Sequence, residues 1–203
     1  MNLKQRCGVW SLAGLFSASL YGAPLQVTVL DSAGQPITGA VVFLESAAAS
    51  AAVRAAAPVN IVQRDKTFIP EVTVIPRGTA VTFPNEDTVR HHVYSFSPVK
   101  QFEIKLYVGT PANPVVFEQS GVAVLGCNIH DEMIAWVLVL DTPYYAQTDA
   151  AGMAEFGAIP VADYTLRVWH KNIHEGDVPQ IPIHINHKTA PQRITLEILT
   201  PIP

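Results

Sequence analysis

Apolar residues occur along this chain in short runs bounded by turn-forming residues, and no long stretch shows the period of an amphipathic helix. The segment 102–107, for example, alternates apolar and polar residues, which is typical of a strand with one buried face. The runs are rich in Val, Ile, Thr and aromatic residues, and 16 prolines and 12 glycines punctuate them. The pattern predicts an all-β protein with strands over residues 25–30, 41–44, 72–75, 79–83, 92–96, 102–107, 122–125, 134–140, 154–156 and 164–170.

Residues 1–23 are expected to be a secretory signal peptide. Lys4 and Arg6 give it a positive start, and the following apolar run, residues 9–21, is too short to span a bilayer. Small residues precede the expected cleavage after Ala23. An uncleaved membrane anchor is the alternative. No later segment resembles a transmembrane helix, so we expect a secreted protein.

Removal of the signal peptide would leave Cys127 as the only cysteine, because Cys7 would leave with the signal. A lone cysteine has no disulfide partner within its own chain in an oxidising compartment. It is therefore buried and inert, reactive, or bound to a metal.

The chain carries a net negative charge. The whole sequence has 13 Lys and Arg against 17 Asp and Glu, and loss of Lys4 and Arg6 leaves 11 against 17, a net charge of −6. Nucleic acids require a basic stripe on their partners, so this balance argues against a nucleic-acid-binding function.

The segment 126–133, Gly-Cys-Asn-Ile-His-Asp-Glu-Met, places Cys127, His130 and Met133 at a regular spacing of three. It lies between two predicted strands, so a rigid frame would support the loop. Each side chain alone has an ordinary explanation, as a buried thiol, a surface imidazole or a core thioether. Together with a second histidine they form the ligand set of a mononuclear electron-transfer copper site. The combination favours copper over the ordinary explanations.

The region around this segment resembles the cupredoxins of the plastocyanin and amicyanin kind. The resemblance rests on a Val-x-Phe-x-Asn-x-Asp pattern at residues 81–87, on the histidine that follows it at position 91, and on the segment 126–133. It implies a Greek-key β-sandwich that holds one type 1 copper ion. The implied copper ligands are His91, Cys127, His130 and Met133, and Asn85 and His92 are candidates to steady the ligand loop.

The residues alone leave open whether His91 or His92 faces the metal. Neighbouring residues on a strand point to opposite faces, so one of the two is expected to do so. His91 shares its face with Val93, and His92 shares its face with Tyr94 and another aromatic residue. Both faces therefore carry apolar side chains. The resemblance favours His91.

The flanks resemble a carboxypeptidase-regulatory, transthyretin-like β-sandwich. The resemblance rests on an Asp-x-x-Gly turn at 31–34, a Gly-Ala-x-Val segment at 39–42, a Thr-Asp-x-x-Gly turn at 148–152 and a Tyr-x-Leu segment at 164–166. We therefore expect a cupredoxin domain inserted into a split sandwich. A tandem arrangement with an unrelated C-terminal tail is the alternative. The expected boundaries are 1–23 for the signal peptide, 24–57 and 142–203 for the split sandwich, and 58–141 for the cupredoxin domain.

The linker into the inserted domain, residues 46–58, is rich in Ala and Ser, and the helix propensity of alanine allows a short helix there. The other histidines lack a nearby thiolate and a compact ligand spacing, so no metal role is expected for them. These are His170, His174, His184 and His187, and a turn is expected at 174–177.

The resemblance implies a periplasmic carrier of single electrons and not an enzyme. A c-type cytochrome or a periplasmic dehydrogenase would be its redox partner, and chains of this combination are similar to methylamine utilization proteins. A copper carrier or storage protein is one alternative, although only Met133 and Met153 would remain after cleavage. A surface β-sandwich module with structural copper is the other. An oxidase would need extra His-x-His pairs.

Overall fold

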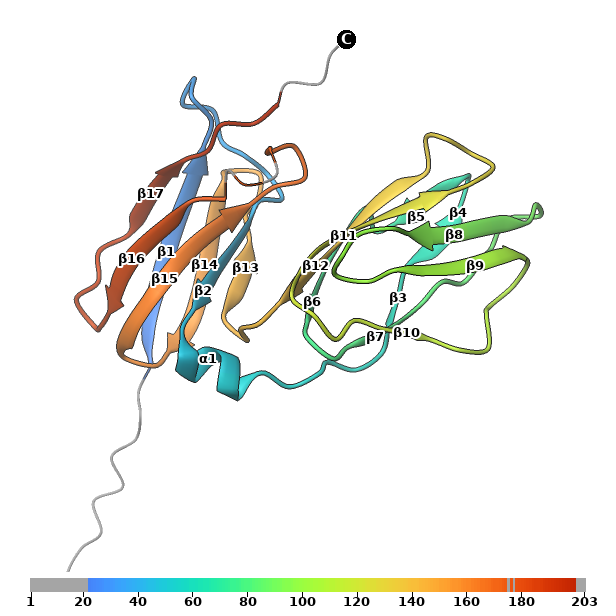
Figure 1. Cartoon of the computed structure of the whole chain (residues 1–203). Helices are drawn as coiled ribbons and strands as arrows, with labels where there is room; N and C mark the ends of the chain where they lie inside the picture. Colours follow the sequence, from blue (N-terminus) through green and yellow to red (C-terminus); the bar gives the residue numbers. More distant parts are fainter. Residues whose placement is uncertain (1–21, 175, 177, 200–203) are drawn as a thin grey trace, which may run out of the picture.

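The computed structural model describes residues 22–174, 176 and 178–199, and nearly all of their regular structure is β-strand (Figure 1). The strands of these residues form five sheets, and one short helix, α1 (Ala47–Ala52), accompanies them. The all-β prediction is thus confirmed. The expected signal peptide lies outside the described residues except for Gly22 and Ala23. Within the described part, none of the helical structure is long and apolar enough to cross a membrane.

The central region, residues 58–141, is built on a five-stranded sheet with a smaller sheet and a hairpin packed against it. A single apolar core lies between these layers and includes Phe83, Phe117 and Leu125. The large sheet has the order β6 (Val72–Pro76), β12 (Ile134–Leu140), β11 (Gly121–Cys127), β8 (His91–Ser95), β9 (Phe102–Tyr107). The small sheet has the order β10 (Val115–Val116), β7 (Ala80–Thr82), β3 (Val59–Asn60), and the hairpin joins β4 (Val62–Arg64) to β5 (Thr67–Ile69).

The flanking region, residues 22–57 and 142–199, forms a second β domain with its own core. Val27, Val42 and Leu166 are fully buried in that core. One sheet has the order β13 (Tyr145–Gln147), β2 (Val41–Glu45), β15 (Ala162–Trp169), β16 (Gln180–Ile185). The other has the order β14 (Met153–Ile159), β1 (Ala23–Leu30), β17 (Gln192–Thr195). Both strands that precede the central region therefore pair with strands that follow it.

An apolar cluster joins the central and flanking regions, which lie side by side in Figure 1. Phe43 and Trp169 contribute from the flanking sheet, and Leu138 and Leu140 contribute from β12. All four side chains are at most 5% exposed. The outer face of β12 is thus covered by the flanking region, while its inner face packs in the central core.

The structure contains several strands that the sequence pattern did not predict, and these are either edge strands or very short strands. β16 contains Pro182 and lies at a sheet edge, where proline is tolerated, and β17 is likewise an edge strand. The other strands that the pattern did not predict are two or three residues long, too short to show alternation. They are β3, β4, β5, β10 and β13. The helix α1 lies in the expected linker, where the Ser46 hydroxyl caps it by accepting from Ala49 N at 3.1 Å.

Candidate metal centre

Three of the four predicted ligands meet at one end of the five-stranded sheet. His91 begins β8, Cys127 ends β11, and His130 lies on the loop from β11 to β12. The Sγ atom of Cys127 lies 3.7 Å from Nδ1 of His91 and 3.9 Å from Nδ1 of His130. One ligand atom from each residue lies within 4.8 Å of the others. Among the described residues, this is the one group of three or more His, Cys, Asp or Glu that could hold a metal ion.

Cys127 is positioned by the alternation of β11. Ala123, Leu125 and Cys127 point in turn into the central core, and Cys127 is 3% exposed. The sequence placed Cys127 on the loop, whereas the structure makes it the last residue of the strand, opposite Val93 of β8. The thiol therefore takes its position from a hydrogen-bonded sheet.

The loop after Cys127 is short and internally bonded. Met133 N donates to the carbonyl of His130 at 3.0 Å, and Asn128 N donates to the carbonyl of His92 at 3.3 Å. These bonds fasten the loop to itself and to β8. His130 is half-buried on it, and its ring centroid lies 5.0 Å from that of His91.

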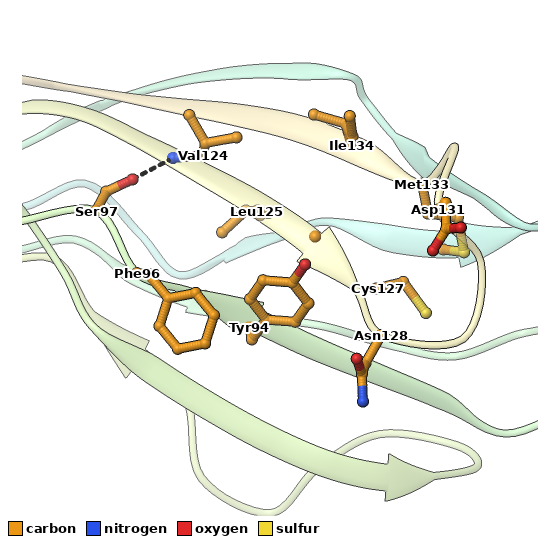
Figure 2. A pocket seen from close by; sticks show the side chains of 11 residues that line it. Tyr94, Phe96, Ser97, Val124, Leu125, Cys127, Asn128, Asp131, Met133 and Ile134 are labelled. Atoms are coloured by element: carbon orange, nitrogen blue, oxygen red, sulfur yellow. Dashed lines mark hydrogen bonds between the residues drawn. The ribbon is translucent and has the colours of Figure 1, made fainter.

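Met133, the fourth predicted ligand, is 1% exposed and packs in the same core as Cys127. Both side chains line one surface pocket, which Asn128 and Asp131 also line. Figure 2 shows Cys127 and Met133 where the ligand loop leaves one strand and enters the next. Met133 thus lies immediately before β12 and lines the same pocket as Cys127.

His91 is fully buried and has both ring nitrogens engaged. Its Nε2 lies 2.7 Å from Oδ2 of Asp87, which leaves Nδ1 facing Cys127. Burial alone would raise the pKa of Asp87. Hydrogen bonds from Lys66 N, from His91 and from Asp65 N outweigh burial and hold this pKa below its ordinary value. The carboxyl group is therefore an anion next to the imidazole.

His92 has a different environment from His91. Its Nε2 lies 3.0 Å from Oε1 of Glu103, and its ring meets that of Tyr94 edge-on at a centroid distance of 6.2 Å. The imidazole thus pairs with a carboxylate on β9. Its backbone carbonyl accepts the hydrogen bond from Asn128 N, which ties the loop to β8.

Asn85 supports the loop before β8. Its Nδ2 donates to the carbonyls of Val89 and Tyr107, each at 2.9 Å, and its Oδ1 accepts from Asp87 N at 3.0 Å. The side chain thus fixes the loop that carries Asp87. Asp87 belongs to the pattern at 81–87, but we predicted no role for it from the sequence. An acidic residue four positions before a candidate ligand histidine was the available signal.

The remaining histidines do not join this group. Burial lowers the pKa of His170, and its Nδ1 accepts from Asn172 N at 3.2 Å. His184 pairs with Asp163 on an exposed surface at 2.7 Å. The exposed His174 begins the expected turn at 174–177, of which residues 175 and 177 lie outside the described part, and His187 is exposed.

The spacing of the three donor atoms fits a metal ion bound by one sulfur and two nitrogens. With metal–sulfur and metal–nitrogen bonds of about 2.3 and about 2.0 Å, an angle of about 120° separates sulfur from nitrogen by about 3.7 Å. The separations of 3.7 and 3.9 Å between Cys127 and the two histidines agree with this value. One thiolate and two imidazoles with a weak thioether are the donors of a blue-copper site.

The fold and the arrangement of these side chains thus define a β-sandwich with a candidate metal centre at one end of its five-stranded sheet. No family model matches the sequence, and no curated protein matches it significantly. Part of the chain is similar to solved structures. A Cu-containing nitrite reductase from Thermus scotoductus is 26% identical over 41% of this chain and 22% of the reductase, with a TM-score of 0.38. The similar part thus spans less than a quarter of the reductase.

Two smaller proteins are similar over nearly their whole length. A purple cupredoxin from Nitrosopumilus maritimus is 24% identical over 40% of this chain and 99% of that protein, with a TM-score of 0.37. Amicyanin from Paracoccus versutus is 19% identical over 49% of this chain and 97% of that protein, with a TM-score of 0.35.

Proposed function

We propose that this protein carries single electrons at one type 1 copper ion held by Cys127, His91, His130 and Met133. The observation that carries the proposal is the convergence of the Cys127 thiol with Nδ1 of both histidines at 3.7 and 3.9 Å. Copper bound to such donors exchanges one electron between Cu(II) and Cu(I). The protein would act as a carrier and not as an enzyme, because the four side chains would complete the site.

The packing of the site suits electron transfer. His91, Cys127 and Met133 are at most 3% exposed, and strand pairing holds the first two in place. A site whose donors are fixed by packing changes little when the charge of the metal changes. The thiolate would supply the strongest bond, and Met133 would be the weak axial donor that tunes the potential.

His130 is the proposed exit for the electron. It is half-buried, and its neighbour Ile129 is 45% exposed. A partner that docks on this end of the sheet would approach the imidazole through an apolar surface. A c-type cytochrome or a periplasmic dehydrogenase is the partner we propose, as for a protein of the methylamine utilization type.

We further propose that residues 1–23 direct secretion to the periplasm and that the central domain, 58–141, is inserted into a transthyretin-like sandwich of 24–57 and 142–203. Pairing of β1 and β2 with β13, β14, β15 and β17 supports the insertion. The same pairing argues against a tandem arrangement, in which the strands before residue 58 would pair among themselves.

The matched variants His91→Ala and His92→Ala test the proposed ligand set. Loaded with Cu(II), the unaltered protein is expected to show an intense visible band from thiolate-to-copper charge transfer. His91→Ala is expected to abolish or shift this band. His92→Ala removes an equal side chain that pairs with Glu103, and it is expected to retain the band. Loss of the band in His92→Ala with retention in His91→Ala would contradict the assignment.

A further inference from the structure

The Asp87 carboxylate joins three groups from two separate segments. Its Oδ2 lies 2.7 Å from Nε2 of His91. Its oxygens also accept from Asp65 N at 2.8 Å and from Lys66 N at 3.0 Å. The side chain is 14% exposed, so these bonds lie at the edge of the packed interior. One carboxylate thus connects the metal centre with the turn between β4 and β5.

The turn between β4 and β5 is shaped to bind this carboxylate. Asp65 and Lys66 have φ values of 54° and 57°, in the left-handed region that residues other than glycine seldom adopt. Successive amides in such a turn point into one concavity that accepts an anion. The two strained residues therefore direct their N–H groups at the carboxylate that holds His91.

The loop that carries Asp87 is fixed independently of the metal. Asn85 N donates to the carbonyl of Gly109 at 2.8 Å, and the Asn85 side chain bonds Val89, Tyr107 and Asp87. The position of the carboxylate is thus set by the protein before a metal binds. A positioning group needs this kind of support.

We propose that Asp87 is a positioning residue of the metal centre, which holds the His91 proton on Nε2 and presents Nδ1 to the copper. A neutral imidazole has one donor and one acceptor, and an ionised carboxylate can only accept. The proton therefore resides on Nε2, and the lone pair of Nδ1 faces Cys127. The inference rests on the proposed function.

The negative charge of Asp87 is also expected to stabilise Cu(II) more than Cu(I). It lies one imidazole ring from the proposed metal position, and an outer carboxylate raises the basicity of a ligand histidine. A more basic ligand stabilises Cu(II) more than Cu(I), so Asp87 lowers the reduction potential. The β4–β5 turn contributes to this effect, because its two amides hold the carboxylate in place.

Asp87→Asn tests the inference, because it keeps the shape of the side chain and removes its charge. The variant is expected to retain the thiolate–copper band and to bind Cu(II) about 10–100-fold more weakly in a chelator competition. If Cu(II) affinity falls tenfold more than Cu(I) affinity, the potential rises by about 59 mV in voltammetry. Asp87→Glu, which keeps the charge, is expected to recover part of both changes.

Asp149→Asn is the matched control. The Asp149 carboxylate accepts from Ala151 N at 2.8 Å and from Met153 N at 2.9 Å, so it caps a turn in the same manner, in the flanking region. The control is expected to leave the potential unchanged. Equal shifts in the two Asn variants, or no shift in Asp87→Asn, would overturn the inference.

The proton position is measurable without a variant. In the Cu(I) protein labelled with ¹⁵N-histidine, His91 is expected to show a slowly exchanging proton on Nε2 and none on Nδ1. The opposite tautomer overturns the inference, even if Asp87→Asn does not fold. Absence of a thiolate–copper band in the unaltered protein would instead overturn the proposed function and this inference with it.

Discussion

His91 and His92 are neighbours in the chain but have different surroundings. His91 is fully buried between Asp87 and Cys127, whereas His92 reaches Glu103 on β9. The difference follows from the alternation of a strand, which sends adjacent side chains to opposite faces. A single position in β8 thus separates a candidate ligand from a histidine that pairs with a carboxylate.

Tyr107, which lies opposite His91 on β9, provides a test at alkaline pH. Burial raises the pKa of Tyr107 to about 12, and a hydrogen bond from Gln63 opposes the rise. The unfolded protein would ionise this phenol near its ordinary pKa of about 10. Since the folded-state pKa is higher, the stabilising contribution is complete below pH 10 and is lost as pH rises to about 12.

Tyr107→Phe is expected to remove this pH dependence. It also removes the hydrogen bond from the Tyr107 hydroxyl to the carbonyl of Phe83 at 2.7 Å, so the variant is expected to be less stable at neutral pH by about 1–3 kcal/mol. Urea unfolding at several pH values measures both effects. An unchanged slope of stability between pH 10 and 12 in the variant would contradict this account.

Among the strands, β11 carries core and candidate ligand side chains on one face and a close aromatic contact on the other. Its inner face carries Leu125 and Cys127, while Gly126 lies on the outer face beneath Tyr94. A Cβ atom at Gly126 would lie 2.7 Å from Cζ of Tyr94 and 2.8 Å from its hydroxyl oxygen. A side chain larger than that of glycine at position 126 would therefore force the Tyr94 ring to move.

Gly126→Ala is expected to destabilise the protein by about 1–3 kcal/mol, the usual cost of overpacking. Gly157→Ala on β14 is the control, since a Cβ there meets nothing within 4 Å and the change should stay within about 0.5 kcal/mol. Urea unfolding compares the two variants. Equal stability of Gly126→Ala and the unaltered protein would refute the close contact with Tyr94.

The sequence predicted the strands with clear alternation and the residues that converge on the site. β9 and β12 were found because six or seven residues carry a visible pattern. β4 and β5 were missed because three residues do not. The role proposed for Asp87 was missed although the residue lies four positions before His91, because the turn that binds its carboxylate, at residues 65–66, has a left-handed backbone without a glycine to mark it. The spacing of residues along the chain can predict a set of candidate ligands. The groups that hold those side chains in place come from loops that are brought together only by folding.

At the scale of the whole molecule, the two β regions are held together at several points. The apolar cluster of Phe43, Leu138, Leu140 and Trp169 covers the outer face of β12. Asp141, at the exit of the central region, accepts from Ser50 of α1 at 2.5 Å and from Arg77 at 2.7 Å. The entry and exit segments of the central region are therefore hydrogen-bonded to each other.

We propose that this protein cycles one electron at a copper ion bound by Cys127. The most direct measurement is a spectroelectrochemical titration of the copper-loaded protein without residues 1–23, beside Cys127→Ser. We predict a reversible change of one electron per protein, in which the thiolate–copper band disappears on reduction and returns on oxidation, and Cys127→Ser lacks the band. A pale Cu(II) spectrum that is the same in both proteins, or copper that is lost on reduction, would contradict the account.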